Sequence, residues 1–164
     1  MSTAASLATI EEIVSTAPLV IRRTVRWGEC DPAGIVYTPR FLDYVVSAYE
    51  GFVSLMLGAP LHGAKGALGV DFPARAVTLD FRSPLALEDR FDMALRVGAL
   101  RRRSYDLHIR ATPPGQPGTV AFLARISPVT VYPRSRAAVA LPPALRAAIA
   151  AYAAAHPLTP EFHA

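Results

Sequence analysis

The sequence is poor in cysteine, in lysine and in long hydrophobic runs. Cys30 is the single cysteine, so an intrachain disulfide is excluded, no Cys/His spacing predicts a zinc site, and a reducing, cytoplasmic setting is favoured. No apolar run reaches the ~18 residues that a membrane-spanning helix needs. The N-terminus does not look like a signal peptide, because its first positive side chain is Arg22 and because Glu11 and Glu12 interrupt any apolar stretch.

The signatures of several common enzyme classes are also absent. The sequence has no Gly-x-Ser-x-Gly nucleophile elbow, no phosphate-binding P-loop and no dinucleotide-binding fingerprint. His108, His156 and His163 have no catalytic partner that the sequence makes visible. The chain is therefore not expected to be an α/β-hydrolase, a P-loop nucleotidase or a Rossmann-type dehydrogenase.

The composition that remains is that of one globular domain. The chain has 164 residues, of which 52% are hydrophobic, which is enough for a substantial core. Residues 1–18 are small and polar, and we expect them to form a flexible leader. Residues 19–164 are then expected to form the folded domain, including a helix at its C-terminal end.

Basic residues cluster around Arg101, Arg102, Arg103 and Arg110, and the formal net charge is +4. Such a cluster is typical of a solvated strand edge. It is also compatible with a polyanion site, either for nucleic acid or for a phosphorylated cofactor. Nucleic acid is the weaker alternative, because no aromatic residues interleave with the basic run and the charge excess is small.

Alternating apolar positions predict five strands, over residues 19–27, 74–82, 90–100, 104–112 and 119–132. In the first strand Arg23 and Trp27 are expected on the same side as Ile21, and in the last strand Pro128 predicts a bulge or an edge. The glycine-rich residues 59–72 are expected to form a connecting loop.

Helical spacing predicts a long helix from Phe41 to Leu57, and an alanine-rich helix follows Pro142. Thr38 is expected to cap the long helix, with Pro39 at its first position. The long helix is apolar almost all round, so we expect it to be nearly enclosed. A strand, a long helix, four strands and a terminal helix predict an α+β fold in which the sheet wraps around the long helix.

The most informative stretch is WGECDPAGIVYTP, residues 27–39. It places the carboxylate of Asp31 on a Pro/Gly loop between a strand and a helix N-terminus, where an oxyanion can be held beside a base or a nucleophile. The alternative is that Asp31 only caps a turn, as Asp before Pro often does. Cys30 is a second candidate nucleophile, but no histidine lies near it in sequence, and a small buried thiol is favoured.

This loop motif, followed by a Pro-x-Phe helix start, resembles that of the 4-hydroxybenzoyl-CoA thioesterase family. The similarity continues through Phe72-Pro73 and through the run from Arg101 to Tyr105, and covers roughly residues 20–135. The resemblance implies a hotdog fold, in which a curved antiparallel sheet wraps around a long central helix. It also implies a homodimer with two sheets joined edge to edge, usually paired again into a homotetramer, with active sites at the dimer interface.

The resemblance also implies roles for individual residues. Asp31 matches the family's nucleophile or general base, and the backbone N–H of Thr38 matches the oxyanion donor, with a simple helix cap as the alternative. Arg101, Arg102 and Arg103 match the run that meets the coenzyme A phosphates. Because neighbouring strand residues face opposite ways, we expect two of the three to bind. No metal, prosthetic group, nucleic acid or membrane is expected as a partner, since coenzyme A is part of the substrate.

Val46 marks a departure from the family. It stands where the 4-hydroxybenzoyl enzyme has a helix carboxylate that meets the ring hydroxyl, and valine cannot accept a hydrogen bond. Tyr37 and His62 are further candidates to line the acyl site, although His62 also fits a solvated loop. We therefore expect hydrolysis of an acyl-CoA with an unsubstituted aromatic group, such as benzoyl-CoA, or with a medium aliphatic group. The alternatives are a thioesterase for acyl chains on carrier proteins and a non-catalytic acyl-CoA-binding protein.

Overall fold

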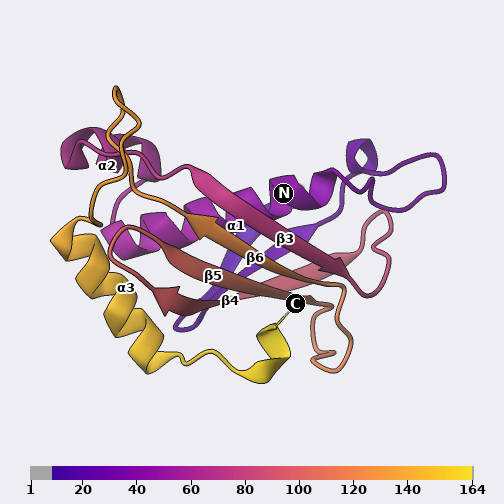
Figure 1. Cartoon of the computed structure of the whole chain (residues 1–164). Coiled ribbons are helices and arrows are strands. Elements are labelled where there is room, and N and C mark those ends of the chain that lie inside the picture. Colours follow the sequence, from indigo (N-terminus) through magenta and orange to yellow (C-terminus); the bar gives the residue numbers. More distant parts are fainter. Residues whose placement is uncertain (1–8, 164) are drawn as a thin grey trace, which may run out of the picture.

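The computed structural model describes residues 9–163 and has the predicted α+β architecture (Figure 1). The strands are β1 (Glu11–Thr16), β2 (Leu19–Thr24), β3 (Ala74–Phe81), β4 (Arg90–Leu100), β5 (Tyr105–Thr112) and β6 (Phe122–Pro128). The helices are α1 (Arg40–Leu57), α2 (Leu61–Leu68) and α3 (Pro143–Ala155), with short 3₁₀ turns η1 (Trp27–Glu29) and η2 (Pro160–Phe162).

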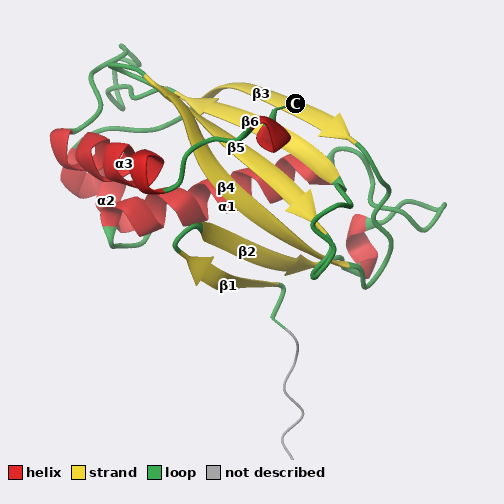
Figure 2. Ribbon diagram, turned by 90° about the horizontal axis from the view of Figure 1, so that it is seen from below, coloured by secondary structure: helices red, strands yellow, loops and turns green. Residues whose placement is uncertain are grey.

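The strands form one antiparallel sheet in the order β1-β2-β4-β5-β6-β3. The sheet curves, and α1 lies along one of its faces (Figures 1 and 2). The register sets the inward side chains opposite one another, for example Ile21 opposite Met93 and Leu95 opposite Ile109. The prediction of a sheet wrapped around a long helix is therefore confirmed.

The core lies between α1 and the sheet. Tyr44, Val45 and Phe52 of α1 have no exposed surface, and neither do Phe91 and Leu107 of the sheet. At the C-terminal end of α1, α3 closes the core. The Tyr152 hydroxyl of α3 donates to the carbonyl of Leu95 at 2.9 Å and accepts from the N–H of Leu19 at 2.9 Å.

Two predictions about chain segments were wrong. Residues 11–16, expected within a flexible leader, form β1, because Arg23 pairs with Glu11 and the backbone pairs with β2; residues 1–8 of that leader lie outside the described part. Residues 59–72, expected as a loop, contain α2. Its two interior glycines disfavour a helix, but Leu61 and Leu68 pack against the core and fix it.

Predictions about the strand before the loop and about the long helix also need correction. The first strand, predicted over residues 19–27, ends at Thr24, so Trp27 lies in η1 instead of beside Ile21 on the strand, and it is 82% exposed. The α1 helix is not enclosed. The sheet covers one side, while Leu42 and Val46 on the other side are 45% and 37% exposed. The side chain of Thr38 forms no cap, and Pro39 is the N-cap residue.

The two edges of the sheet differ. At one edge, β1 is short and its register shifts between Ile13 and Ser15, which hinders pairing with another strand. At the other edge, β3 is eight residues long, and its irregularity is confined to its first residues. No single helix within residues 9–163 is long and apolar enough to cross a membrane; α1 and α2 meet that length and composition only as a pair bent by 57°.

Candidate active site

The segment from Cys30 to Val36 is a tight hairpin that the sequence builds locally. Asp31 N–H donates to the carbonyl of Ile35 at 2.8 Å, and Gly34 N–H donates to the carbonyl of Asp31 at 2.9 Å. Gly34 has a φ of 82°, a conformation that favours glycine. Cys30 bridges to Val36, whose N–H donates to Leu85 at 2.8 Å. The loop is thus held to the segment before β4.

The carboxylate of Asp31 is half-buried and only partly committed to its own turn. Its Oδ1 accepts from the N–H of Ala33 at 2.8 Å, which is the turn-capping bond that the sequence leaves as an alternative. Its Oδ2 accepts no hydrogen bond from the described residues. Asp31 lines a hollow of about 540 Å³ together with Trp27, Cys30 and Leu87. Asp31 can therefore cap its turn and also act in a reaction, because Oδ1 fixes the carboxylate and Oδ2 is available to accept a proton or to attack.

Thr38 offers an unused backbone donor at the start of α1. Its carbonyl accepts from Phe41 N–H at 3.2 Å, but within residues 9–163 its own N–H meets no acceptor. Pro39 follows and has no N–H. Thr38 lines a separate hollow of about 340 Å³, whose walls are mostly apolar, with Phe41, Phe81 and Leu85, and which Arg82 also borders.

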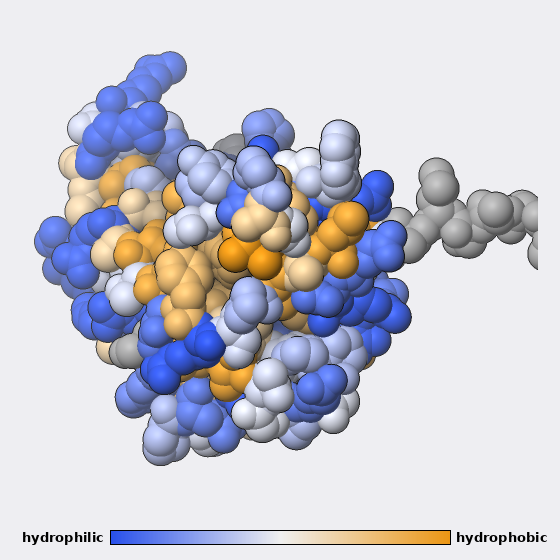
Figure 3. All heavy atoms as spheres, turned by 90° about the vertical axis from the view of Figure 1, so that its right-hand side faces the viewer, coloured by the Kyte–Doolittle hydropathy of each residue, from blue (hydrophilic) through white to orange (hydrophobic). Residues whose placement is uncertain are grey.

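Asp31 and Thr38 therefore lie on the same loop but border two different hollows in the protomer. Figure 3 looks onto the end of the molecule that faces right in Figure 1, and hydrophobic side chains gather in and around a depression there. Phe81, at the end of the edge strand β3, forms part of the second hollow and is 48% exposed. One protomer thus leaves this surface open beside the free sheet edge.

The arginine run forms the turn between β4 and β5, and its three side chains are not equivalent. Arg101 makes a bidentate ion pair with Asp106, at 3.0 and 2.9 Å, which lowers the pKa of that carboxyl. Arg102 and Arg103 are exposed and have no carboxylate partner in the described chain. Their carbonyls accept from Leu141 and Thr130 N–H, so the turn itself is fixed.

The arginine run and Asp31 lie at opposite ends of the sheet. Val25, just before the loop, donates to Asp89 at the start of β4, whereas Arg101 follows the end of β4. Eleven strand residues at about 3.3 Å each separate the two ends by about 35 Å. A single protomer therefore does not bring Arg102 and Arg103 to Asp31.

The three candidate acyl contacts are placed differently from one another. Tyr37 is 56% exposed beside Thr38, and Val46 lies on the open side of α1. His62 is exposed on α2, beyond the C-terminal end of α1, and the 18 residues of α1 span about 27 Å. In one protomer Tyr37 therefore lies at the Asp31 end and Val46 lies on the open face of α1. His62 lies at neither place.

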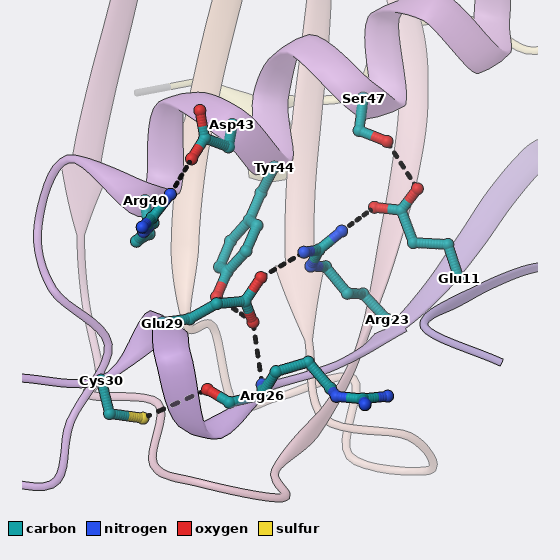
Figure 4. A network of polar contacts seen from close by, with 9 residues as sticks. All are labelled: Glu11, Arg23, Arg26, Glu29, Cys30, Arg40, Asp43, Tyr44 and Ser47. Atoms are coloured by element: carbon teal, nitrogen blue, oxygen red, sulfur yellow. Dashed lines mark hydrogen bonds and ion pairs between the residues drawn. The ribbon is translucent and has the colours of Figure 1, made fainter. Parts of the chain in front are cut away.

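A polar network beneath the loop was missed by the sequence analysis (Figure 4). Arg23 of β2 is inward-facing and pairs with Glu29 and Glu11, and Glu29 also accepts from the Tyr44 hydroxyl at 3.1 Å. The signal was present, because an arginine between the inward residues Ile21 and Val25 requires a buried partner.

Cys30 is not suited to attack. Its thiol lies 3.8 Å from the carbonyl of Arg26. Burial, and then the negative charges of Glu29 and Asp31, raise the pKa of the Cys30 thiol. The thiolate, which is the nucleophilic form, is therefore disfavoured.

Comparison with known proteins now places the chain. A family model described as the thioesterase-like superfamily matches residues 25–149, which include the loop, α1 and the strands β3 to β6. The chain belongs to the thioesterase-like superfamily. A relative within the superfamily is a 1,4-dihydroxy-2-naphthoyl-CoA hydrolase of Synechococcus elongatus, 30% identical over 101 residues that cover 61% of this chain and 74% of that protein.

Solved structures agree on the fold. A 1,4-dihydroxy-2-naphthoyl-CoA thioesterase from Synechocystis superposes with a TM-score of 0.72 at 21% identity, over 80% of this chain and 94% of that one. A Staphylococcus aureus protein in complex with CoA gives a TM-score of 0.78 at 18% identity, over 94% and 92% of the two chains. The predictions of a hotdog thioesterase fold and of a thioesterase family are confirmed.

Proposed function

We propose that this thioesterase-like protein hydrolyses an acyl-CoA, with Asp31 and the Thr38 N–H as its catalytic groups. The observation that carries the proposal is their shared loop, which holds one carboxylate oxygen and one backbone N–H without partners in the described chain. The named relative, a CoA hydrolase, supports the substrate class. A screen of acyl-CoA esters with detection of the released thiol tests it; no hydrolysis of any ester would refute it.

The chemistry follows from the two groups. Asp31 either attacks the thioester carbonyl carbon or takes a proton from the water that attacks it. The carbonyl oxygen then becomes an oxyanion, to which Thr38 N–H donates; such a donor is worth ~10²–10³-fold in turnover. Collapse of the tetrahedral intermediate breaks the carbon–sulfur bond and expels the coenzyme A thiolate. If water attacked, the free acid forms at once and the proton held by Asp31 goes to the thiolate; if Asp31 attacked, a mixed anhydride remains on Asp31, and a second step with water releases the acid and restores the carboxylate. Either role for Asp31 needs the same carboxylate.

The complete site requires two copies of the chain. The C-terminal end of β3 lies with Thr38, because Phe81 and Thr38 line the same hollow. Its N-terminal end lies with the arginine turn, because Ala74 pairs with Pro128 and Thr130 binds the carbonyl of Arg103. Antiparallel pairing of two β3 edges about a two-fold axis therefore brings Arg102 and Arg103 of a second copy to the Asp31 end.

The arginines then suit the phosphates of coenzyme A, since guanidinium groups bind phosphate through forked donors. Arg101 is already committed to Asp106, which leaves Arg102 and Arg103 for this task. Pairing of two such dimers over the open α1 face, where Leu42 and Val46 are exposed, remains a prediction.

Val46 gives a prediction about the acyl group. A para-hydroxyl that is buried against valine lacks an acceptor, which costs about 1–3 kcal/mol. We expect the wild-type protein to hydrolyse benzoyl-CoA ~10-fold better than 4-hydroxybenzoyl-CoA, as judged by kcat/KM. Val46→Asp should reverse this preference, whereas Val46→Leu should keep it. Equal kcat/KM values of the wild-type protein for the two esters would contradict the prediction.

A further inference from the structure

The carboxylate of Glu29 makes hydrogen bonds to three parts of the fold, the strand β2, the helix α1 and the start of the turn η1. Its Oε1 pairs with Arg23 of β2, and its Oε2 accepts from the Tyr44 hydroxyl of α1 at 3.1 Å and from Arg26 N–H at 2.8 Å (Figure 4). The side chains of Arg23 and Glu29 are each only 13% exposed. The link is therefore a buried charged contact between the strand, the helix and the turn.

The same residue closes the loop that carries the proposed catalytic groups. The carbonyl of Glu29 accepts from Tyr37 N–H at 2.8 Å. Asp31 follows Glu29 by two residues, and Thr38 follows Tyr37. Glu29 thus binds both ends of the loop through its backbone and joins the loop to α1 through its side chain.

The remaining members of the network hold Arg23 in place. Glu11 of β1 accepts from Arg23 and from the Ser47 hydroxyl of α1. The guanidinium of Arg23 lies 4.5 Å from the centre of the Tyr44 ring. Burial alone would lower the pKa of Arg23, but its hydrogen bonds to Glu29 and Glu11 raise it, so it stays charged.

We infer that Glu29 is a positioning residue: together with Arg23 and Tyr44 it fixes the distance between the Asp31 carboxylate and the Thr38 N–H. This inference rests on the proposed function, since it assigns a second layer to the same site. Catalytic groups must be held within about 0.5 Å of their productive arrangement. Loss of this anchor moves the loop against α1, and a shift of about 1 Å costs up to ~10²-fold in rate.

The test is the variant Glu29→Gln, which keeps the shape of the side chain and removes its charge. We expect kcat to fall ~10–10²-fold, with KM within ~3-fold of the wild type, because an interaction needed in the transition state is lost while substrate binding is not. Tyr44→Phe removes only the hydroxyl bond to Glu29. It should lower kcat in the same direction by about 3–10-fold, and it preserves the test if Glu29→Gln fails to fold.

Asp92→Asn supplies the matched control. Asp92 pairs at 2.6 Å with Arg22, the neighbour of Arg23 on β2. The side chains of Arg22 and Asp92 are 25% and 20% exposed, so this ion pair is also partly buried. It contacts neither the loop nor α1 in the hydrogen bonds of the described chain. Asp92→Asn should lower the melting temperature yet leave kcat within about 2-fold. A merely structural role for Glu29 predicts that both variants lose kcat in proportion to their stability.

Cys30 provides a readout that does not need turnover. It is the single thiol, lies between Glu29 and Asp31, and is partly buried. Its reaction rate with a thiol reagent should rise in Glu29→Gln and in Tyr44→Phe, because a loosened loop opens more often. Tyr44→Phe changes no charge, so its effect reports loop opening alone, and Asp92→Asn should leave the rate unchanged.

Unchanged kcat in Glu29→Gln, or an equal loss in Asp92→Asn, would overturn the inference. So would Cys30 rates that stay at the wild-type value in both network variants. If the wild-type protein hydrolyses no thioester, the proposed function fails, and the Cys30 rates still decide whether the network holds the loop.

Discussion

Asp31→Asn should lower kcat for the best acyl-CoA substrate by ~10²–10⁴-fold, the usual contribution of a general base. The amide oxygen of asparagine can still accept from Ala33 N–H, which lies 2.8 Å from Oδ1 in the wild type. The loop should therefore keep its shape, and KM should change little. The substitution removes the negative charge that either attacks the thioester or accepts the proton from water.

Asp43→Asn is the control for this experiment. Asp43 lies in the first turn of α1, is 62% exposed and, among residues 9–163, pairs only with Arg40, at 3.1 Å. The Asp43→Asn variant also removes one negative charge near the N-terminal end of α1, and its kcat should stay within about 2-fold of the wild-type value. Steady-state kinetics of the three proteins decide the matter. Full activity of Asp31→Asn would show that the carboxylate only caps its turn.

Replacing Arg102 and Arg103 together by alanine should raise KM for an acyl-CoA by ~10²-fold, because each charge-assisted hydrogen bond to a phosphate is worth about 1.5 kcal/mol or more. The value of kcat at saturation should change little, since both residues act far from the reacting bond. The same variant should hydrolyse the acyl ester of a short thiol, which has no phosphate, as well as the wild type does.

Arg125→Ala is the matched charge deletion, because Arg125 is exposed on the sheet and its one side-chain hydrogen bond to a described residue is a long one, to Thr78 at 3.5 Å. Its KM should remain within about 2-fold, and the KM of the wild type should rise with salt. An equal increase of KM in Arg125→Ala would mean that net charge, and not a phosphate site, governs binding. A carrier-protein substrate would be indicated if only carrier-linked esters responded to the Arg102 and Arg103 substitutions.

The order of the helices and strands could be predicted from the sequence, because the spacing of apolar residues and the length of each segment indicate the same kind of element. Phe91, Met93 and Leu95 alternate along β4 with residues that are polar or small, and all three are buried. Gly58, at a φ of 63°, ends α1 where the sequence predicted. Local spacing decides such features, so they need no knowledge of tertiary contacts.

The failures arose where tertiary contacts overrule local preference. The α2 helix contains Gly63 and Gly66 and forms because its leucines reach the core. The β1 strand looked like a leader, since its stability comes from pairing with β2 and from Arg23, neither of which is local in sequence. The long helix was expected to be nearly enclosed because it is apolar almost all round, yet the sheet covers only one side of α1 and leaves Leu42 and Val46 exposed.

The loop and the arginine run can be located in the sequence, but their arrangement in space cannot. The motif around Asp31 marks the loop. The expectation that two arginines of the run bind one ligand came from alternation along a strand, whereas the structure places the run in a turn and pairs Arg101 with Asp106. No pattern in one chain indicates that Arg102 and Asp31 lie at opposite ends of the sheet, since that follows from strand order and direction. The partner of Arg23 is likewise visible only once β2 and η1 are folded together.

One mixing experiment tests the central claim, that a thioesterase site combines Asp31 of one copy with Arg102 and Arg103 of another. Asp31→Asn and the Arg102→Ala/Arg103→Ala double variant are each assayed alone at low acyl-CoA, then unfolded, mixed in equal amounts and refolded. Half of the resulting dimers carry one intact site and one doubly altered site, so activity should return to about a quarter of the wild-type value. A mixture no more active than the average of the two variants would contradict the shared site.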